Sequence, residues 1–235
     1  MEKTYVTAII VAAGSSTRMG GHVSKQLMCI LGKSVIEHTL NAFENAESID
    51  EVVIVARDCD REEIQKRIDR NGFEKVKKIV NGGKTRSESV RNGIAQCDEK
   101  TTHVAIHDGA RPLVTPEDIE NVVDVGLCYG GATLGTKVID TIKVIGKDSV
   151  ITSTPDRDKL VAVQTPQVFR LEDYISALDE LKSKGKEAEF TDDCAIFEAT
   201  GRNVKVVEGS RENIKITTAE DITTAENIMR SRRKA

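Results

Sequence analysis

VTAIIVA, residues 6–12, followed by AGSSTRMG, residues 13–20, is the stretch that decides the fold of this chain. The first part is an apolar run rich in β-branched residues, which predicts a strand buried on both faces of a parallel sheet. The small residues after it let backbone N–H groups approach an anion, and Arg18 and Lys25 place two cations within reach. The stretch therefore predicts a phosphate loop at the carboxyl end of a strand. Spacing alone leaves one alternative open, a tight turn with surface cations.

Glycine spacing excludes two other nucleotide motifs. Ser16 and Met19 stand where the dinucleotide fingerprint has its second and third glycines. Gly83-Lys84-Thr85 resembles the end of a P-loop, but the first glycine of that loop would fall at Lys78. The chain is therefore neither a dinucleotide-binding dehydrogenase by this motif nor a P-loop nucleotidase.

Strand and helix patterns alternate from this stretch to about residue 132. Apolar runs predict strands, and capped or periodic segments predict helices. The strands are expected at 51–56, 76–81 and 104–108, and the helices from 35, over 60–70, over 85–96 and from 116. This alternation predicts an α/β fold with a doubly wound, mostly parallel, Rossmann-like sheet, in one domain over residues 1–235.

The pattern changes after about residue 132. Residues 133–145 and 150–154 are β-like with no helix between them, which predicts a projecting hairpin, an arm over about residues 133–157. A helical pattern returns at 171–184, and a capped helix follows Thr218. Residues 214–217 alternate apolar and polar side chains, as in a strand with one polar face.

Composition narrows the class of protein. The 235 residues carry a formal net charge of only −4, whereas a nucleic-acid binder usually presents a basic face. No apolar run approaches the ~20 residues of a membrane span, and the N-terminal residues lack the pattern of a signal peptide. The five cysteines lack zinc-site spacing. We therefore expect a cytoplasmic enzyme that binds neither nucleic acid nor membrane.

Asp108 is the first candidate functional residue outside the opening stretch. It ends a predicted strand and precedes Gly109, at the edge where open α/β sheets bind ligands. An aspartate that caps a turn is the alternative. His107 points to the opposite face of that strand, so we expect it to be a core histidine.

Six groups of residues, in this order, resemble one family. They are Ala12-Ala13-Gly14-x-x-x-Arg18-Met19 with Lys25-Gln26; Gly82-Gly83-Lys84-Thr85-Arg86 with Ser87 and Ser89; His107-Asp108-Gly109-Ala110-Arg111-Pro112; Asp140-Thr141; Gln164-Thr165-Pro166-Gln167; and Thr191-Asp192-Asp193 with Asn213-Ile214-Lys215-Ile216-Thr217. Together they resemble the 2-C-methyl-D-erythritol 4-phosphate cytidylyltransferases, over about residues 6–228. Ser16 departs from the glycine of many relatives, but a small serine leaves the backbone donors usable.

The resemblance implies transfer of CMP from CTP to 2-C-methyl-D-erythritol 4-phosphate, with release of pyrophosphate and with Mg²⁺ or another divalent cation as cofactor. It assigns catalysis to Arg18 and Lys25. The implied nucleotide-binding residues are Ala12, Ala13, Gly14, Ser16, Gly83, Lys84, Ser89, Asp108, Gly109 and Lys215. The implied substrate-binding residues are Asp108, Thr141, Arg157, Thr165, Thr191 and Lys215. Asp108 is the one candidate for a direct metal ligand.

The arm suggests an assembly. An isolated hairpin is marginally stable in water, so the arm should pack against something. The resemblance implies a homodimer in which Thr141 and Arg157 complete the active site of the partner, and an arm folded onto its own subunit is the alternative.

Two other functions remain open. A ribitol-5-phosphate cytidylyltransferase would share the base and phosphate sites and differ in the polyol pocket. A nucleotide-sensing module without catalysis is disfavoured, because a sensor has no need of the two cations Arg18 and Lys25 at the reacting phosphate.

Overall fold

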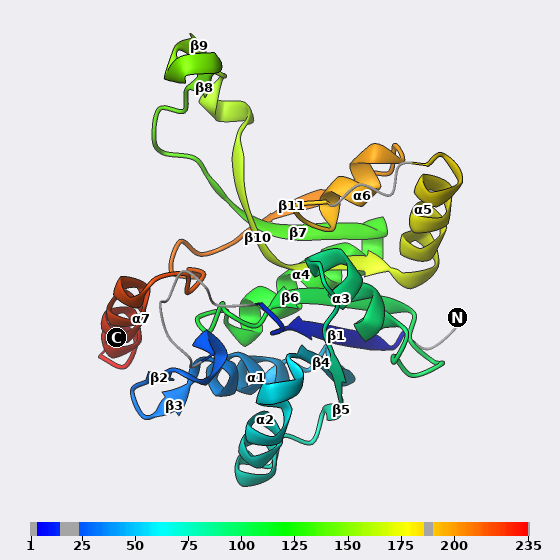
Figure 1. Cartoon of the computed structure of the whole chain (residues 1–235), viewed down its shortest axis with the longest axis vertical. Helices are drawn as coiled ribbons and strands as arrows, with labels where there is room; N and C mark the ends of the chain where they lie inside the picture. Colours follow the sequence, from blue (N-terminus) through cyan, green and yellow to red (C-terminus); the bar gives the residue numbers. More distant parts are fainter. Residues whose placement is uncertain (1–3, 15–23, 186–189, 235) are drawn as a thin grey trace.

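A seven-stranded sheet runs through the centre of the molecule (Figure 1), in the order β11-β7-β10-β6-β1-β4-β5. A computed structural model describes residues 4–14, 24–185 and 190–234. The strands are β1 (Val6–Val11), β4 (Glu51–Ala56), β5 (Val76–Asn81), β6 (His103–Asp108), β7 (Gly131–Lys137), β10 (Val161–Arg170) and β11 (Lys205–Glu208). All neighbours are parallel except β10, which is antiparallel to β6 and β7. The prediction of a doubly wound, mostly parallel sheet is confirmed.

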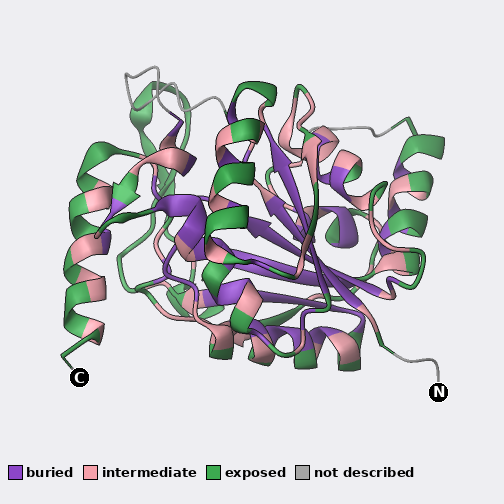
Figure 2. Cartoon of the chain, turned by 90° about the horizontal axis from the view of Figure 1, so that it is seen from below, coloured by how far each residue is buried: buried purple, intermediate pink, exposed green. Residues whose placement is uncertain are grey.

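Helices cover both faces of this sheet, and the inner strands β1, β4 and β6 are buried between them (Figure 2). The first face carries α1 (Val35–Asn45), α2 (Asp58–Asn71) and α4 (Pro116–Tyr129). The opposite face carries α3 (Arg86–Ile94), α5 (Leu171–Ser183) and α6 (Cys194–Ala199). The last helix, α7 (Ala219–Arg232), packs beside the short strands β2 (Cys29–Ile30) and β3 (Lys33–Ser34). None of the described helices combines the length and the apolar character that a membrane span requires.

Helix starts follow the predicted caps. Ser34 and Glu37 form a reciprocal capping box at α1, and Thr115 does the same with Asp118 at α4, where Pro116 is the first helical residue. Each cap satisfies backbone N–H groups that the first turn leaves without partners. The sequence predictions for these helices are confirmed.

The predicted hairpin is wrong over residues 133–137, whereas Val144–Ile145 and Ile151–Ser153 do pair with each other. Gly131–Lys137 pairs with β10 and β11 inside the central sheet, because Ala132 and Leu134 are buried in the core against α4. In the arm itself, between β7 and β10, the paired segments are β8 (Val144–Ile145) and β9 (Ile151–Ser153), with the short helical turns η3 (Lys147–Ser149) and η4 (Arg157–Lys159) beside them. This shorter arm projects from the body of the molecule (Figure 1).

Strand order fixes where a ligand can bind. The chain passes from β1 to β4 and β5 on one side and returns to β6 on the other side of β1. Such a reversal opens a crevice at the carboxyl ends of the strands. Val11 and Asp108, the last residues of β1 and β6, are register partners there. Because β7 runs in the same direction as β6, the arm leaves the sheet at this same edge.

Candidate active site

The loops after β1 and β5 meet at close range. A Cβ built on Gly82 would lie 2.2 Å from the Cβ of Ala13, so only glycine allows this approach. Next to it, the Gly83 N–H donates to Ser89 Oγ at 3.0 Å, and that hydroxyl donates to the Thr85 carbonyl at 2.9 Å. The structure therefore brings together three of the expected nucleotide-binding residues, Ala13, Gly83 and Ser89.

The other expected nucleotide residues lie around this contact. Ala12 is fully buried, and a Cβ built on Gly109 would lie 3.3 Å from its Cβ. Gly14 and Lys84 are exposed. Lys25 is half-buried in the short helical turn η2 (Lys25–Leu27). The expected residues Ser16 and Arg18 lie outside the described residues.

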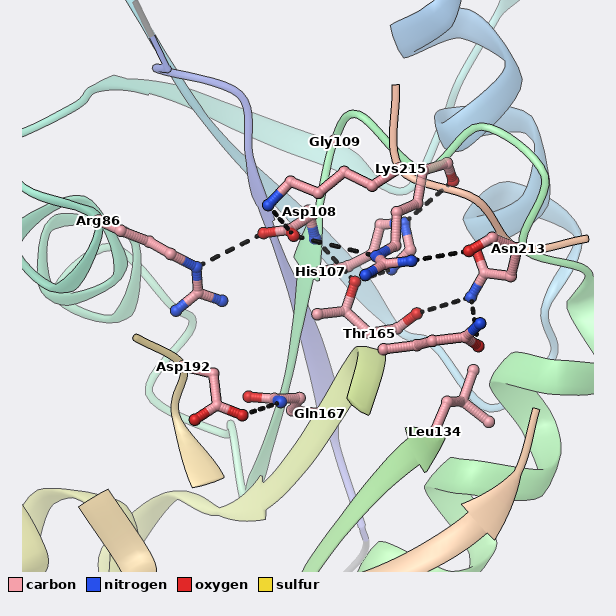
Figure 3. Close-up of polar contacts among 12 residues, drawn as sticks. Arg86, His107, Asp108, Gly109, Leu134, Thr165, Gln167, Asp192, Asn213 and Lys215 are labelled. Atoms are coloured by element: carbon pink, nitrogen blue, oxygen red, sulfur yellow. Dashed lines mark hydrogen bonds and ion pairs between the residues drawn. The ribbon is translucent and has the colours of Figure 1, made fainter. Parts of the chain in front are cut away.

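Asp108 is the centre of a cluster of cations (Figure 3). It is 9% exposed, and its Oδ2 lies 2.7 Å from Lys215 Nζ and 3.9 Å from Arg111 Nε. Its Oδ1 lies 3.5 Å from Arg86 Nε. Burial acts to raise the pKa of Asp108, but the charges of Lys215 and Arg86 outweigh it and hold the pKa far below its usual range. The carboxylate is therefore ionised throughout the physiological range.

Arg86 joins Asp108 to a second buried carboxylate. Its Nη1 lies 2.6 Å from Asp193 Oδ2, and the Tyr174 hydroxyl donates to Asp193 Oδ1 at 2.8 Å. The backbone N–H of Asp193 donates to Gln167 Oε1 at 2.9 Å. Arg86, at the start of α3, thereby ties that helix to the segment before α6.

His107 is a core residue, as predicted. It is fully buried, and its ring lies 5.0 Å from the ring of Phe43. Its Nε2 lies 3.3 Å from the Arg111 carbonyl, which can only accept, so Nε2 carries the proton. Nδ1 then accepts from the Thr165 hydroxyl at 3.1 Å. Burial lowers the pKa of His107 to about 3, so the ring is neutral and takes no part in acid–base chemistry near pH 7.

Thr165 and Lys215, two of the expected substrate-binding residues, contact Asp108 or its backbone. Thr165 Oγ1 accepts from the Asp108 N–H at 3.1 Å. Lys215, however, is not on a strand: residues 209–218 form no regular element, and the prediction from alternation is wrong. The Ile216 N–H donates to the Ala110 carbonyl at 2.8 Å, and Ile216 is buried against Val35. Packing of the apolar side chains explains the alternation without a sheet.

The remaining substrate candidates lie apart from Asp108 in this chain. Thr191 is exposed, two residues before Asp193. Thr141 and Arg157 are exposed on the arm, where Arg157 Nη1 donates to the Ile139 carbonyl at 2.9 Å. In the described part of the chain, no hydrogen bond or ion pair joins either arm residue to the cluster around Asp108.

The described residues hold no group of three or more His, Cys, Asp or Glu side chains with the geometry of a metal site. Asp108 is a single carboxylate and already faces three cations. Mg²⁺ is commonly held by one or two carboxylates together with substrate phosphates. The donor set thus fits a cation that arrives with a triphosphate, and Asp108 is the protein group that would face it.

Sequence reasoning missed four residues of this network: Arg86, Arg111, Gln167 and Asp193. All four lie inside the segments that carried the resemblance, but none had a role. A usable signal existed for Arg111, which follows Asp108 by three residues and can turn back towards it. Arg86 and Asp193 are 107 residues apart in sequence, and only the fold brings them together.

Comparisons with known proteins identify the family of the chain. The family model described as 2-C-methyl-D-erythritol 4-phosphate cytidylyltransferase matches residues 6–231. The chain is 41% identical to the protein of that name from Pelotomaculum thermopropionicum, covering 97% of this chain and 95% of the relative, and 43% identical to that of Caldanaerobacter subterraneus, covering 96% and 99%. The solved structure of 4-diphosphocytidyl-2C-methyl-D-erythritol synthase from Anaerococcus prevotii has a TM-score of 0.84 at 32% identity, covering 97% of this chain and 99% of that one. The chain therefore belongs to the 2-C-methyl-D-erythritol 4-phosphate cytidylyltransferase family.

Proposed function

We propose that the chain transfers CMP from CTP to 2-C-methyl-D-erythritol 4-phosphate at the sheet edge where Ala13, Gly83 and Asp108 meet. One observation carries the proposal: the buried, ionised Asp108 is surrounded by cations, and one of them, Arg86, follows a glycine loop that admits close backbone approach. This is the arrangement expected for a polyphosphate nucleotide at the switch point of an open α/β sheet. Family membership supplies the name of the substrate.

A phosphate oxygen of 2-C-methyl-D-erythritol 4-phosphate attacks the α-phosphorus of CTP. A new P–O bond forms, the bond between the α-phosphorus and the bridging oxygen breaks, and pyrophosphate leaves with that electron pair. Fixed cations stabilise the negative charge on the transferring phosphoryl group. Lys25 and Lys215 are the described lysines that we assign to this work, and Arg18 joins them by family resemblance. The attacking phosphate is already an anion near pH 7, so the step needs no general base.

Ser89 supplies a chemical reason for selecting cytosine. Its hydroxyl proton is committed to the Thr85 carbonyl and one lone pair accepts from the Gly83 N–H, so Ser89 Oγ can offer a ligand only its second lone pair. The exocyclic amine of cytosine donates to a lone pair, whereas the corresponding carbonyl of uracil would meet it as a second acceptor. This supports CTP over UTP.

Mg²⁺, or another divalent cation, completes the proposal. When bound, it would neutralise phosphate charge in the transition state. Asp108 would hold it on the protein side, while Lys215 and Arg86 keep that carboxylate ionised.

We further propose a homodimer, with the arm of one subunit reaching the site of the other. Its support is the exposed apolar surface of the arm, where Ile139, Ile145, Val150 and Ile151 are each more than half exposed. In such a dimer Thr141 and Arg157 would bind the polyol phosphate together with Thr165, Thr191 and Lys215. All five cysteines are free thiols, which fits a reducing compartment such as the cytoplasm.

The test is pyrophosphate release by the purified chain with Mg²⁺. We expect release with CTP and 2-C-methyl-D-erythritol 4-phosphate, and kcat/KM lower by about a hundredfold or more with UTP, because a site that pairs with the amine leaves polar groups unpaired with uracil. Ribitol 5-phosphate should be a poor substrate. Equal turnover of the two polyol phosphates would contradict the assigned substrate. No release with either would favour a nucleotide-sensing module.

A further inference from the structure

Lys215 depends on a segment that has no secondary structure of its own. Residues 209–218 follow β11 and precede α7 without forming a strand or a helix. Nevertheless Lys215 Nζ is held 2.7 Å from Asp108 Oδ2, with its side chain 40% exposed. A long, partly exposed lysine does not keep one position unless its backbone is fixed. One backbone bond, from the Ile216 N–H to the Ala110 carbonyl, holds the residue after Lys215. The residues before Lys215 are held by buried side chains.

Asn213 closes a ring of contacts around Asp108 (Figure 3). The Asp108 N–H donates to Thr165 Oγ1 at 3.1 Å, and the Thr165 carbonyl accepts from Asn213 Nδ2 at 3.1 Å. The Asn213 carbonyl accepts from Arg111 Nη1 at 2.7 Å, and Arg111 Nε returns to Asp108 Oδ2 at 3.9 Å. Asn213 is fully buried, so the bond from its amide to the Thr165 carbonyl is shielded from water, while the two Arg111 contacts are partly buried. The ring fixes the backbone two residues before Lys215.

Gln164 holds the same segment at a second point. Its Oε1 accepts from Asn213 Nδ2 at 3.3 Å, and its Nε2 donates to the Ser210 carbonyl at 2.9 Å. Gln164 lies in β10, where the register with β7 shifts between Val163 and Gln167, and it is 7% exposed. The shift releases this side chain from the regular pleat and directs it to the 209–218 segment.

We infer that Asn213, supported by Gln164, is a positioning residue that acts through Lys215. The buried amide fixes the segment so that the Lys215 ammonium meets Asp108 at the phosphate end of the site. Neither amide needs to contact a substrate for this role. The inference rests on the proposed function, because its readout is cytidylyl transfer.

The experiment is a double-variant cycle with Asn213→Ala, Lys215→Ala and the double variant. We expect Asn213→Ala to lower kcat/KM by about 10- to 100-fold, because misplacing a reacting group by about an ångström has an effect of that size. In the Lys215→Ala background the same change should lower kcat/KM by less than about threefold, because residues that act as a unit are not additive. The parameter that changes, kcat or KM, should be the same in both single variants.

Asn71→Ala is the matched control. Asn71 Nδ2 also donates two bonds, to Glu37 Oε1 at 2.9 Å and to the Arg67 carbonyl at 2.8 Å, but it joins α2 to α1 away from the site. It should lower the melting temperature and leave kcat/KM unchanged. If Asn213→Ala does not fold, Gln164→Met replaces it, because methionine keeps the volume and removes both hydrogen bonds.

Two outcomes would overturn the inference. One is wild-type kcat/KM in a folded Asn213→Ala or Gln164→Met variant. The other is that Asn213→Ala lowers kcat/KM by the same factor in the wild type and in the Lys215→Ala background. A Lys215→Ala variant with wild-type activity would instead contradict the role proposed for Lys215 itself. A wild-type chain that releases no pyrophosphate would contradict the proposed function, so the failures are distinguishable.

Discussion

Asp108 carries one negative charge and lies among three cationic side chains, Arg86, Arg111 and Lys215. Because positive charge exceeds negative charge in this cluster, the site suits phosphates. Asp193 neutralises part of Arg86, but Lys215 and Arg111 have no second carboxylate within salt-bridge distance in the described part of the chain. The cluster therefore keeps an excess of positive charge at the edge of the sheet. In a partly buried site such charge acts more strongly on a ligand than it would in water.

Lys25 tests the role of fixed cations in catalysis. We expect Lys25→Ala to lower kcat by about a hundred- to a thousandfold, the effect of removing one group that stabilises the developing oxyanion. The KM for CTP should change far less. Steady-state kinetics of pyrophosphate release measure both values. Lys33→Ala, an exposed lysine on β3, is the control and should leave kcat unchanged. A folded Lys25→Ala enzyme with wild-type kcat would remove Lys25 from the mechanism.

His107 predicts a pH dependence of stability. Its pKa falls from 6.5 to about 3 on folding because the neutral ring is buried, so below pH 6.5 the unfolded chain binds a proton that the folded chain does not. The contribution of His107 to the free energy of unfolding is therefore fully present above pH 6.5 and is lost as the pH falls towards 3. Between pH 7 and 5 this residue should lower the free energy of unfolding by about 2 kcal/mol.

Urea unfolding of the wild type and of His107→Gln at the two pH values, in metal-free buffer, measures this contribution. In His107→Gln, the free energy of unfolding should fall by about 2 kcal/mol less between pH 7 and 5 than in the wild type. His38 and His103 are present in both proteins, so their contributions cancel in this difference. Equal decreases in the two proteins would show that His107 does not titrate in this range.

Contacts between distant residues explain why the sequence predicts this site only in part. Asp108 could be found from its own surroundings, because it ends an apolar run and precedes glycine. The partner of Arg86, in contrast, is set by the packing of α3 against the segment before α6. Asn213 and Gln164 are ordinary polar residues in the sequence, and their role depends on a register shift that no local pattern announces.

At the scale of elements, strands β1, β4, β5 and β6 were predicted close to their observed bounds, whereas β10 and β11 were not predicted. The centre of β10, Gln164-Thr165-Pro166-Gln167, interrupts the apolar pattern with polar residues and a proline. The three polar side chains are buried because each has a hydrogen-bond partner: Gln164 and Gln167 outside the sheet, and Thr165 on β6. Burial of paired polar groups gives no hydrophobic periodicity, so pattern analysis does not detect this strand.

The contact between the loops after β1 and β5 gives a prediction at this scale. We expect Gly82→Ala to raise the KM for CTP by about tenfold or more, because the new Cβ, 2.2 Å from that of Ala13, forces the loops apart. Titration of CTP in the pyrophosphate assay measures this.

Gly126→Ala is the comparison for Gly82→Ala. Its new Cβ would lie 2.5 Å from Val168 Cγ1, between α4 and β10, far from the nucleotide loops in sequence. It should lower stability and leave the KM for CTP unchanged. Similar KM values in the two variants would mean that the loop contact does not shape the nucleotide site.

At the scale of the whole molecule, the arm is the part that a single chain does not explain. Its paired strands contain only two and three residues, too few for an independent hairpin. Several of its apolar side chains are exposed together, namely Ile139, Ile142, Val144, Ile145, Val150 and Ile151. This exposed apolar surface is the observation behind the proposed homodimer, and the arm leaves the sheet at the same edge as the active site.

Co-expression of Lys25→Ala and Arg157→Ala chains tests whether two subunits share each site. Each variant should be nearly inactive alone. If Arg157 serves the site of the partner, a mixed dimer holds one intact site, with Lys25 from one chain and Arg157 from the other. Random pairing makes half of the dimers mixed, so activity should recover to about a quarter of the wild type. If Arg157 acts within its own chain, no pairing assembles a complete site. Mixed dimers, isolated with two affinity tags, that show no recovered activity would therefore rule out the shared site.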